Sequence, residues 1–183
     1  MPQLVKNGAL VADGWTLVRD VAQSTTAQLS AQLAEPPPPY AIVPLAFWLA
    51  ANDDLRARGD VGVWLAPADD PTLLAADAAR LPLIAVDFPK FTDGRGYSIG
   101  RLLRERFGFA GELRAIGDIQ RDQLYYLHQV GFDAFAVRDD NDLRSTLAAL
   151  DDFSDGYQAT NRRTPWFRRS GTDALARNRG IRE

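Results

Sequence analysis

Short apolar runs alternate with amphipathic segments through residues 61–157 of this 183-residue chain. The runs are VGVWLA (61–66), LIAVDF (83–88), GELRAIG (111–117) and AFAV (134–137). VGVWLA and the first four residues of LIAVDF are continuous and apolar, which is typical of strands that are covered on both faces. Each run is followed by a segment with apolar residues at helical spacing. This alternation predicts a parallel sheet with right-handed crossover helices.

Two architectures are compatible with such a sheet. The alternation favours a doubly wound, flavodoxin- or Rossmann-like sheet of about four to five strands. A partial (β/α) barrel is the alternative, because strand patterns do not determine closure. We assign residues 41–160 to this α/β domain. Residues 1–40 add a β-hairpin, with Asp13-Gly14 at its turn, and a proline-rich spacer, and residues 161–183 form a basic tail.

Composition excludes several kinds of site and partner. The chain has no cysteine and one histidine, His128, which excludes thiolate metal sites, cysteine nucleophiles and histidine-rich metal sites. A net charge of -3 does not favour nucleic acid as a partner. No apolar run approaches about 18 residues, and the N-terminus lacks a targeting pattern. We therefore expect a cytoplasmic protein that does not enter the membrane.

The second apolar run leads into a charged loop with two glycines, and then into a helix. Lys90 in this loop is one of two lysines among the 21 basic residues, the others being arginines. Backbone amides at a glycine turn and at the start of a helix bind anions, and a lysine adds a compact positive charge. We therefore expect a phosphate, sulfate or carboxylate to bind here. The predicted ligand-binding residues are Lys90, Thr92, Asp93, Gly94, Arg95, Gly96, Tyr97 and Ser98.

The carboxyl ends of parallel strands lie on one rim, so carboxylates from other strands should meet this loop. Asp87, Lys90 and Asp118 are the candidates for a catalytic role, and Asp87 with Asp118 would suit general acid–base chemistry. Structural roles compete with these functional ones. Asp93 and Ser98 would cap the helix that follows the loop, and Asp118 would cap the next helix. No metal site is indicated.

Two dense motifs lie between residues 87 and 135, and with them the chain resembles DUF934, a bacterial family of unknown function. The resemblance covers most of the chain after residue 41. It implies a link to assimilatory sulfite reduction, because members are typically encoded beside sulfite or nitrite reductase and adenylyl-sulfate reductase. It implies no particular catalytic residues. The motifs are FPKFTDGRGYS (88–98) and a GD…DQ pattern formed by Gly117, Asp118, Asp122 and Gln123.

Three functions follow as hypotheses. The first is an accessory protein of sulfite reduction that binds a small oxyanion or a phosphate-bearing ligand at the loop and docks to the sulfite or nitrite reductase. The second is an oxidoreductase with a non-covalently bound flavin or nicotinamide, because flavodoxin-like sheets bind flavin without a glycine fingerprint. The third is a non-catalytic scaffold for the reductase complex. The sequence leaves open whether the chain is an enzyme.

Overall fold

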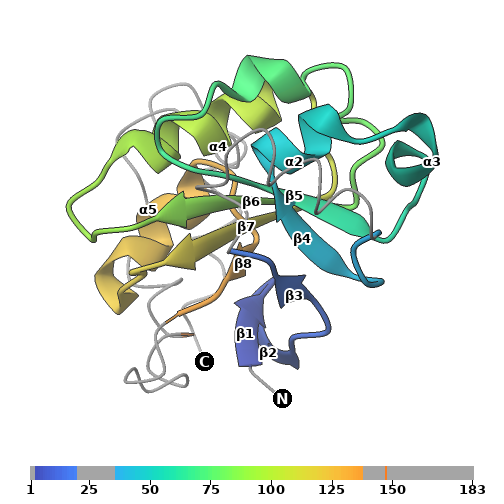
Figure 1. The fold of residues 1–183 in the computed structure, drawn as a ribbon. Coiled ribbons are helices and arrows are strands. Elements are labelled where there is room, and N and C mark those ends of the chain that lie inside the picture. Colours follow the sequence, from blue (N-terminus) through green and yellow to red (C-terminus); the bar gives the residue numbers. More distant parts are fainter. Residues whose placement is uncertain (1–2, 20–35, 138–146, 148–183) are drawn as a thin grey trace, which may run out of the picture.

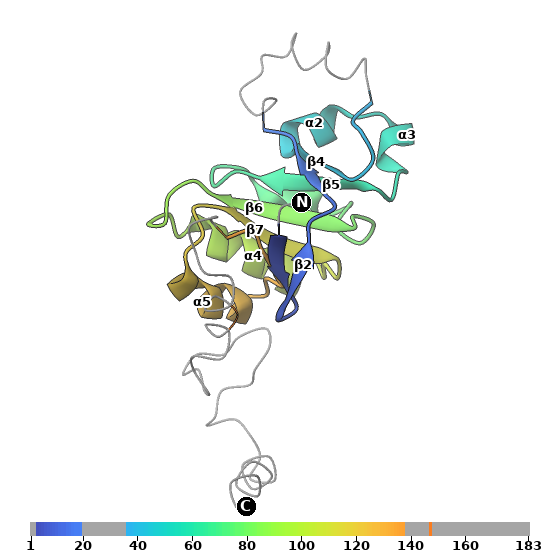
Figure 2. The same ribbon diagram turned by 90° about the horizontal axis from the view of Figure 1, so that it is seen from below.

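The computed structural model describes residues 3–19, 36–137 and 147 (Figures 1 and 2). The predicted basic tail at 161–183 and most of the last predicted helix lie outside these residues. No helix within the described ranges is long and apolar enough to span a bilayer. The elements are β1 (Gln3–Lys6), β2 (Ala9–Ala12), β3 (Thr16–Leu17), β4 (Ala41–Pro44), α2 (Leu45–Ala50), α3 (Asp53–Arg56), β5 (Val61–Leu65), η1 (Pro71–Leu74), β6 (Leu83–Phe88), α4 (Arg95–Glu105), β7 (Glu112–Gly117), η2 (Arg121–Gln123), α5 (Leu124–Gln129) and β8 (Ala134–Phe135).

The described strands form one eight-stranded sheet in the order β2-β1-β8-β7-β6-β5-β4-β3. Strands β3 to β8 are parallel and follow one another in chain order, whereas β1 is antiparallel to both β8 and β2. A doubly wound sheet reverses its strand order at a switch point, and this sheet does not. The flavodoxin-like prediction is therefore wrong. The sheet is a curled half-barrel, which corresponds to the predicted alternative (Figure 1).

The short link between β2 and β3 requires the sheet to curl. These strands lie at opposite edges of the sheet, yet the link consists of Asp13, Gly14 and Trp15 alone. In a flat sheet, the seven gaps of about 4.8 Å would place the edges about 34 Å apart. Three linking residues span at most about 14 Å. The chain therefore passes directly from one edge of the half-barrel to the other and holds the two edges together.

Helices cover one face of the sheet and form the main core with it. Val63 and Val86, on neighbouring strands, belong to the same cluster of buried side chains as Leu103 of α4. The opposite strand face carries a smaller cluster that includes Trp64 and Ala85. Every residue of β5 and β6 is buried, as the continuous apolar runs predict for strands with both faces covered.

The chain begins with a hairpin, but it is not the predicted one: β1 pairs with β2, whereas the runs on either side of Asp13-Gly14 do not pair with each other. The turn is formed by Asn7 and Gly8, which connect β1 to β2. Both have positive φ, 50° for Asn7 and 76° for Gly8, as a two-residue type I′ turn requires. Asp13-Gly14 lies instead in the link between β2 and β3.

Strands β3 and β4 raise the strand count above the predicted four to five. The four residues of β4 are all buried, but its run AIVP is short and ends in Pro44. A proline is common at the start of a helix, so the sequence around Pro44 predicts a helix and not the end of a strand. Pro44 belongs to both elements, because it is the last residue of β4 and also the N-cap of α2.

Candidate functional site

The predicted site begins with the loop between β6 and α4, at the carboxyl-terminal rim of the half-barrel. Arg95, the first residue of α4, forms a two-point pair with Asp93: Nε lies 3.0 Å from Oδ1, and Nη2 lies 2.7 Å from Oδ2. Hydrogen bonds from the Arg95 side chain and backbone N–H hold the pKa of Asp93 below its usual value. The same pairing raises the pKa of Arg95. An anion at this loop must therefore share Arg95 with Asp93 or displace Asp93.

Lys90 and Thr92 are exposed on the same loop. The Lys90 side chain has no hydrogen-bond or ion-pair partner among the described residues, although its charge helps to lower the pKa of Asp93. The backbone of the loop turns at this point, because the Asp93 N–H donates to the Lys90 carbonyl at 2.9 Å. Lys90 is thus a cation of this rim that a ligand can reach without breaking an ion pair.

The three glycines around the start of α4 have different roles. Gly94 is the N-cap, and a Cβ atom there would meet Tyr97 at an ordinary 4.0 Å. A Cβ atom at Gly96 would lie 2.5 Å from the ring of Phe88, and one at Gly100 would collide with an aromatic ring of the core. Gly96 and Gly100 therefore let α4 pack closely on the core. At Gly94, no such contact demands glycine.

Neither Asp93 nor Ser98 is the N-cap of α4, which is Gly94, but Asp93 lies directly before it and bonds to the first turn. Asp93 Oδ1 accepts the backbone N–H of Arg95 at 3.2 Å, and so supplies the side-chain bond that Gly94 cannot make. Ser98 is the fourth residue of α4 and is exposed. It lies too far along the helix to act as its N-cap.

The two dense motifs meet at this rim through Phe91. The Phe91 N–H donates to Asp118 Oδ2 at 3.2 Å, and the Phe91 carbonyl accepts from Gln123 Nε2 at 3.0 Å. The backbone N–H of Asp118 also donates to the Phe88 carbonyl at 2.7 Å. These bonds tie the loop after β7 to the loop after β6. They therefore hold in place the backbone that carries Lys90.

The helix cap predicted at Asp118 lies at Gln120 instead. Gln120 and Gln123 form a capping box at the start of η2, in which the Gln120 N–H donates to Gln123 Oε1 at 3.0 Å. Gln123 thus bonds to both loops, since its Nε2 donates to the Phe91 carbonyl of the loop after β6. It also bonds to the hydroxyl of Tyr97, whose pKa is raised by burial despite this hydrogen bond.

Asp87, the other predicted catalytic carboxylate, holds the N-terminal segment. Its Oδ1 accepts from Arg19 Nη2 at 3.0 Å. Arg19 also lies over the ring of Trp64, 5.8 Å from the centroid, and Trp64 Nε1 donates to the Val18 carbonyl at 3.0 Å. Asp87 therefore anchors the segment after β3, whereas Asp118 fixes a loop. The structure gives the two predicted acid–base partners separate structural roles.

The comparisons with known proteins agree with the motifs at this rim. The family model for DUF934, a bacterial protein of unknown function, matches residues 62–178. The chain belongs to the DUF934 family. No curated protein and no solved structure shows a significant match to it. The DUF934 match includes β6, β7 and both of the interlocked loops, so the rim is part of the family's own sequence.

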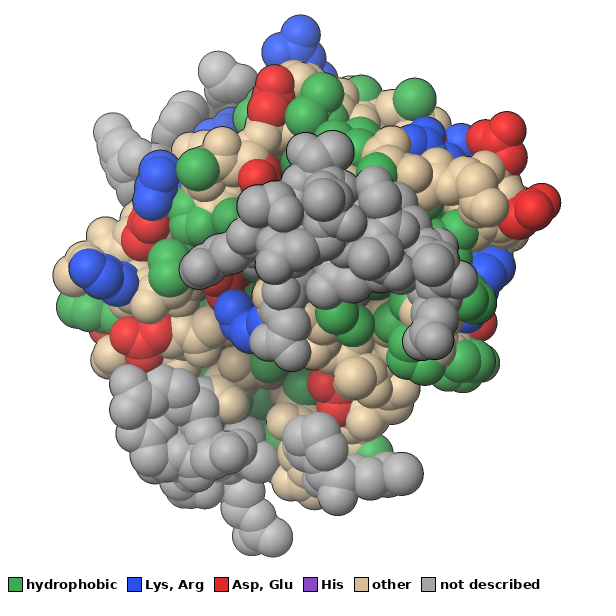
Figure 3. Space-filling model, in the orientation of Figure 1, with side chains coloured by type: hydrophobic (Ala, Val, Ile, Leu, Met, Phe, Trp, Pro, Cys, Tyr) green, Lys and Arg blue, Asp and Glu red, His purple; other side chains and the backbone are tan. Residues whose placement is uncertain are grey.

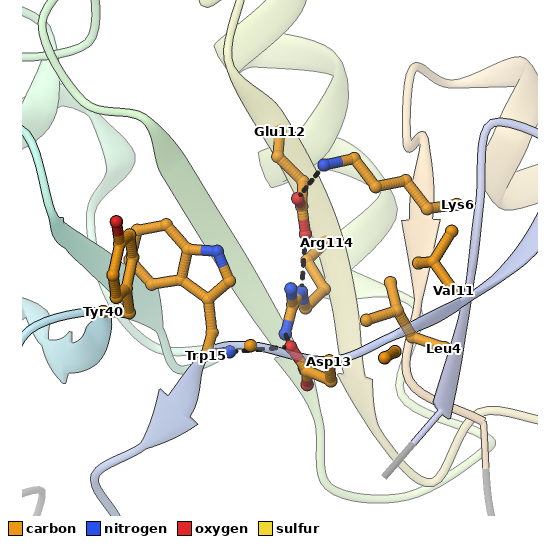
Figure 4. A pocket seen from close by; sticks show the side chains of 10 residues that line it. Leu4, Lys6, Val11, Asp13, Trp15, Tyr40, Glu112 and Arg114 are labelled. Atoms are coloured by element: carbon orange, nitrogen blue, oxygen red, sulfur yellow. Dashed lines mark hydrogen bonds and ion pairs between the residues drawn. The ribbon is translucent and has the colours of Figure 1, made fainter. Parts of the chain in front are cut away.

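A hollow of about 240 Å³ lies at the amino-terminal rim, and the β7 residues that line it fall within the DUF934 match. No motif of the sequence predicts it. Figure 4 shows Trp15 and Tyr40 on one side and Leu4 and Val11 on the other, with the side chains of β7 between them. The ring centroids of Trp15 and Tyr40 lie 5.5 Å apart, edge to face. Three separate parts of the chain therefore build this hollow.

A chain of ion pairs crosses the hollow (Figure 4). Lys6 Nζ lies 2.6 Å from Glu112 Oε2, and Glu112 Oε1 accepts from Arg114 Nε at 2.7 Å. Arg114 Nη1 reaches both oxygens of Asp13, at 3.0 and 2.9 Å. The Arg114 side chain is 3% exposed, so its charge depends on these partners. Two charged residues, Glu112 and Arg114, at alternate positions of the strand run GELRAIG are the sequence signal that could have revealed the cluster.

Proposed function

We propose that this DUF934 protein is an accessory protein of assimilatory sulfite reduction and binds a small oxyanion at the β6–α4 loop. The link to sulfite reduction rests on the family resemblance. The binding proposal rests on one observation: Lys90 is exposed beside the start of α4, on a loop held by Asp118 and Gln123. A loop that is already held loses little conformational entropy when a ligand binds.

Sulfite, sulfate and phosphate suit this loop because they combine negative charge with several acceptor oxygens. Lys90 supplies a positive charge, and the N-terminal end of the 11-residue helix α4 supplies the positive end of a helix dipole. Arg95 can add a second cation, since an exposed ion pair such as Asp93–Arg95 is weak and can be opened by a competing anion. The anion would then take the place of the Asp93 carboxylate.

Thermal unfolding in sulfite, sulfate and phosphate tests the binding proposal. An anion at ten times its Kd stabilises the folded state by about 1.4 kcal/mol, which raises Tm by about 3–5 °C for a chain of this size. We expect that rise for the wild type in sulfite and none for Lys90→Ala/Arg95→Ala. Arg101→Ala is the matched control, because Arg101 is an exposed arginine further along α4 that pairs with Glu105. The proposal is wrong if no anion stabilises the wild type more than the double variant.

The link to sulfite reduction has a separate test in the source bacterium. Deletion of the gene should slow growth when sulfate is the sulfur source, and growth on cysteine should be normal. The wild-type gene should restore growth on sulfate, and the Lys90→Ala/Arg95→Ala gene should not. Normal growth of the deletion strain on sulfate would contradict the proposed role.

The oxidoreductase hypothesis receives no support from the described residues. It drew on flavin binding at the switch point of a flavodoxin-like sheet, and this sheet has no reversal of strand order. The visible absorbance spectrum of the purified protein is the direct measurement of a bound flavin.

A further inference from the structure

We propose that the hollow at the amino-terminal rim is a second binding site, for a small planar molecule that carries a carbonyl or carboxylate oxygen. It lies at the end of the strands opposite to the β6–α4 loop. Glu112 is the first residue of β7, and Tyr40 directly precedes β4. Six residues of β6 span about 20 Å, so the two sites are separate. This inference is therefore independent of oxyanion binding at Lys90.

The walls of the hollow favour a flat apolar body. Trp15 lies on one side, and Leu4 and Val11 of the hairpin lie on the other (Figure 4). The indole of Trp15 is held by its edge-to-face contact with Tyr40, and the Trp15 backbone is fixed by a bond from its N–H to Asp13 Oδ1 at 3.0 Å. An aromatic ring inserted between an indole and aliphatic side chains gains contact area on both of its faces.

The hydrogen-bonding groups left over in the hollow are donors. Both oxygens of Asp13 and both of Glu112 already accept bonds or ion pairs from Arg114 or Lys6. By contrast, Arg114 Nη2 and the indole N–H of Trp15 have no partner among the described residues, and Lys6 uses one of its three N–H groups there. Arg114 as a whole is 2% exposed and lines the hollow, so a ligand there would give its free Nη2 an acceptor. The hollow therefore selects a ligand with an acceptor oxygen.

Size and charge narrow the class of ligand further. A volume of about 240 Å³ is just below the range of about 300–1,000 Å³ that is usual for drug-sized ligands, which suits one ring with a short substituent. The two cations and two anions of the ion-pair chain sum to zero, so the hollow does not require a charged ligand. An amine would compete with Lys6 and Arg114 for carboxylates that are already engaged, and should bind poorly.

Three ring compounds of similar size test this selection on the full-length protein. We would titrate acetophenone (a neutral carbonyl), benzoate (a carboxylate) and benzylamine (a cation with no acceptor oxygen) and follow ligand-observed NMR. We expect acetophenone or benzoate, or both, to bind at least fivefold more tightly than benzylamine. If acetophenone alone binds, the ligand of the hollow carries a neutral carbonyl. If benzoate alone binds, the ligand carries a carboxylate. The proposal is wrong if benzylamine binds as tightly as both others, or if none binds.

Two variants and one spectrum locate the bound probe. Trp15→Leu should weaken the probe that binds at least fivefold, and Lys6→Met should weaken benzoate more than acetophenone. Arg101→Gln is the control. Arg101 lies in α4 and does not line the hollow, so this variant should bind the probe as the wild type does. If Trp15→Leu does not fold, the indole N–H resonances of the wild-type protein give the answer, since the Trp15 resonance should shift while that of buried Trp48 does not. Unchanged binding in a folded Trp15→Leu protein, or no shift at Trp15, would overturn the proposal.

Discussion

At the scale of single residues, Gly96 is a position in α4 where one added methyl group should be costly. Its Cβ would lie 2.5 Å from the ring of Phe88, which is fully buried and cannot move aside. We expect Gly96→Ala to lower the free energy of unfolding by about 1–3 kcal/mol, because overpacking strains a filled core. Gly94→Ala should lose less than about 1 kcal/mol, since its Cβ meets only an ordinary contact. Urea denaturation measures both, and equal losses would contradict the packing role of Gly96.

Asp77 is a residue whose charge can be tested through pH. Its side chain is 6% exposed and accepts from Trp48 Nε1 at 2.9 Å and Arg80 Nη2 at 2.6 Å. Burial raises its pKa, but these bonds and the charges of Arg56 and Arg80 outweigh burial, so the pKa lies below its usual value. A lowered pKa stabilises the folded state above the unfolded-state pKa of about 3.9, and this contribution is lost as the pH falls.

We therefore expect Asp77→Asn to lower the free energy of unfolding by about 1–3 kcal/mol at pH 7. The difference from the wild type should shrink as the pH falls from about 5 toward 3, because the Asp77 carboxylate of the unfolded state has the higher pKa and takes up a proton before that of the folded state. Urea denaturation at a series of pH values measures this. Asp60→Asn is the control, since Asp60 pairs with Arg58 near the surface, where both side chains are partly exposed and such a pair is worth about 1 kcal/mol. A difference for Asp77→Asn that persists undiminished to pH 3 would rule out the charge as its cause.

At the scale of elements, Gln123 joins two loops, and its removal should loosen the loop after β6. Gln123→Ala loses the bond to the Phe91 carbonyl and the capping-box bond to the Gln120 N–H. We expect a loss of about 1–3 kcal/mol in the free energy of unfolding, since the hydrogen bonds of the buried Gln123 side chain are lost together. Hydrogen exchange should become faster at Phe91 and Asp93. Asp122→Ala, at the exposed neighbouring position, should leave exchange unchanged.

Most elements of the sheet could be predicted from the sequence, because fully buried parallel strands leave continuous apolar runs. β5 and β6 begin and end within one or two residues of their predicted bounds. The hairpin turn was misplaced because two pairs, Asn7-Gly8 and Asp13-Gly14, both carry a turn signature. Strand β3 has two residues and β4 ends in a proline, so neither carries a clear strand pattern. Short edge elements depend on their neighbours more than on their own residues.

At the scale of the whole molecule, strand order was the part of the fold that local patterns could not supply. A flavodoxin-like sheet and a half-barrel share the same strand–helix alternation, and long-range pairing decides between them. The rim loop was predictable because its residues are contiguous between β6 and α4. The amino-terminal hollow was not, because Lys6, Asp13 and Trp15 meet Tyr40 and Arg114 only after the sheet has curled.

The curled shape should itself depend on the pair between Asp13 and Arg114, which joins the link between the edge strands to the centre of the sheet. Asp13→Ala leaves the buried Arg114 charge with Glu112 as its partner among the described residues, and we expect a loss of about 3 kcal/mol in the free energy of unfolding. Arg114→Met removes the charge that needs Asp13. The double variant should therefore lose at least about 1 kcal/mol less than the sum of the two single variants. Urea denaturation of the four proteins measures this coupling, and purely additive losses would mean that the link is held across the half-barrel by its other contacts, such as Trp15 on Tyr40.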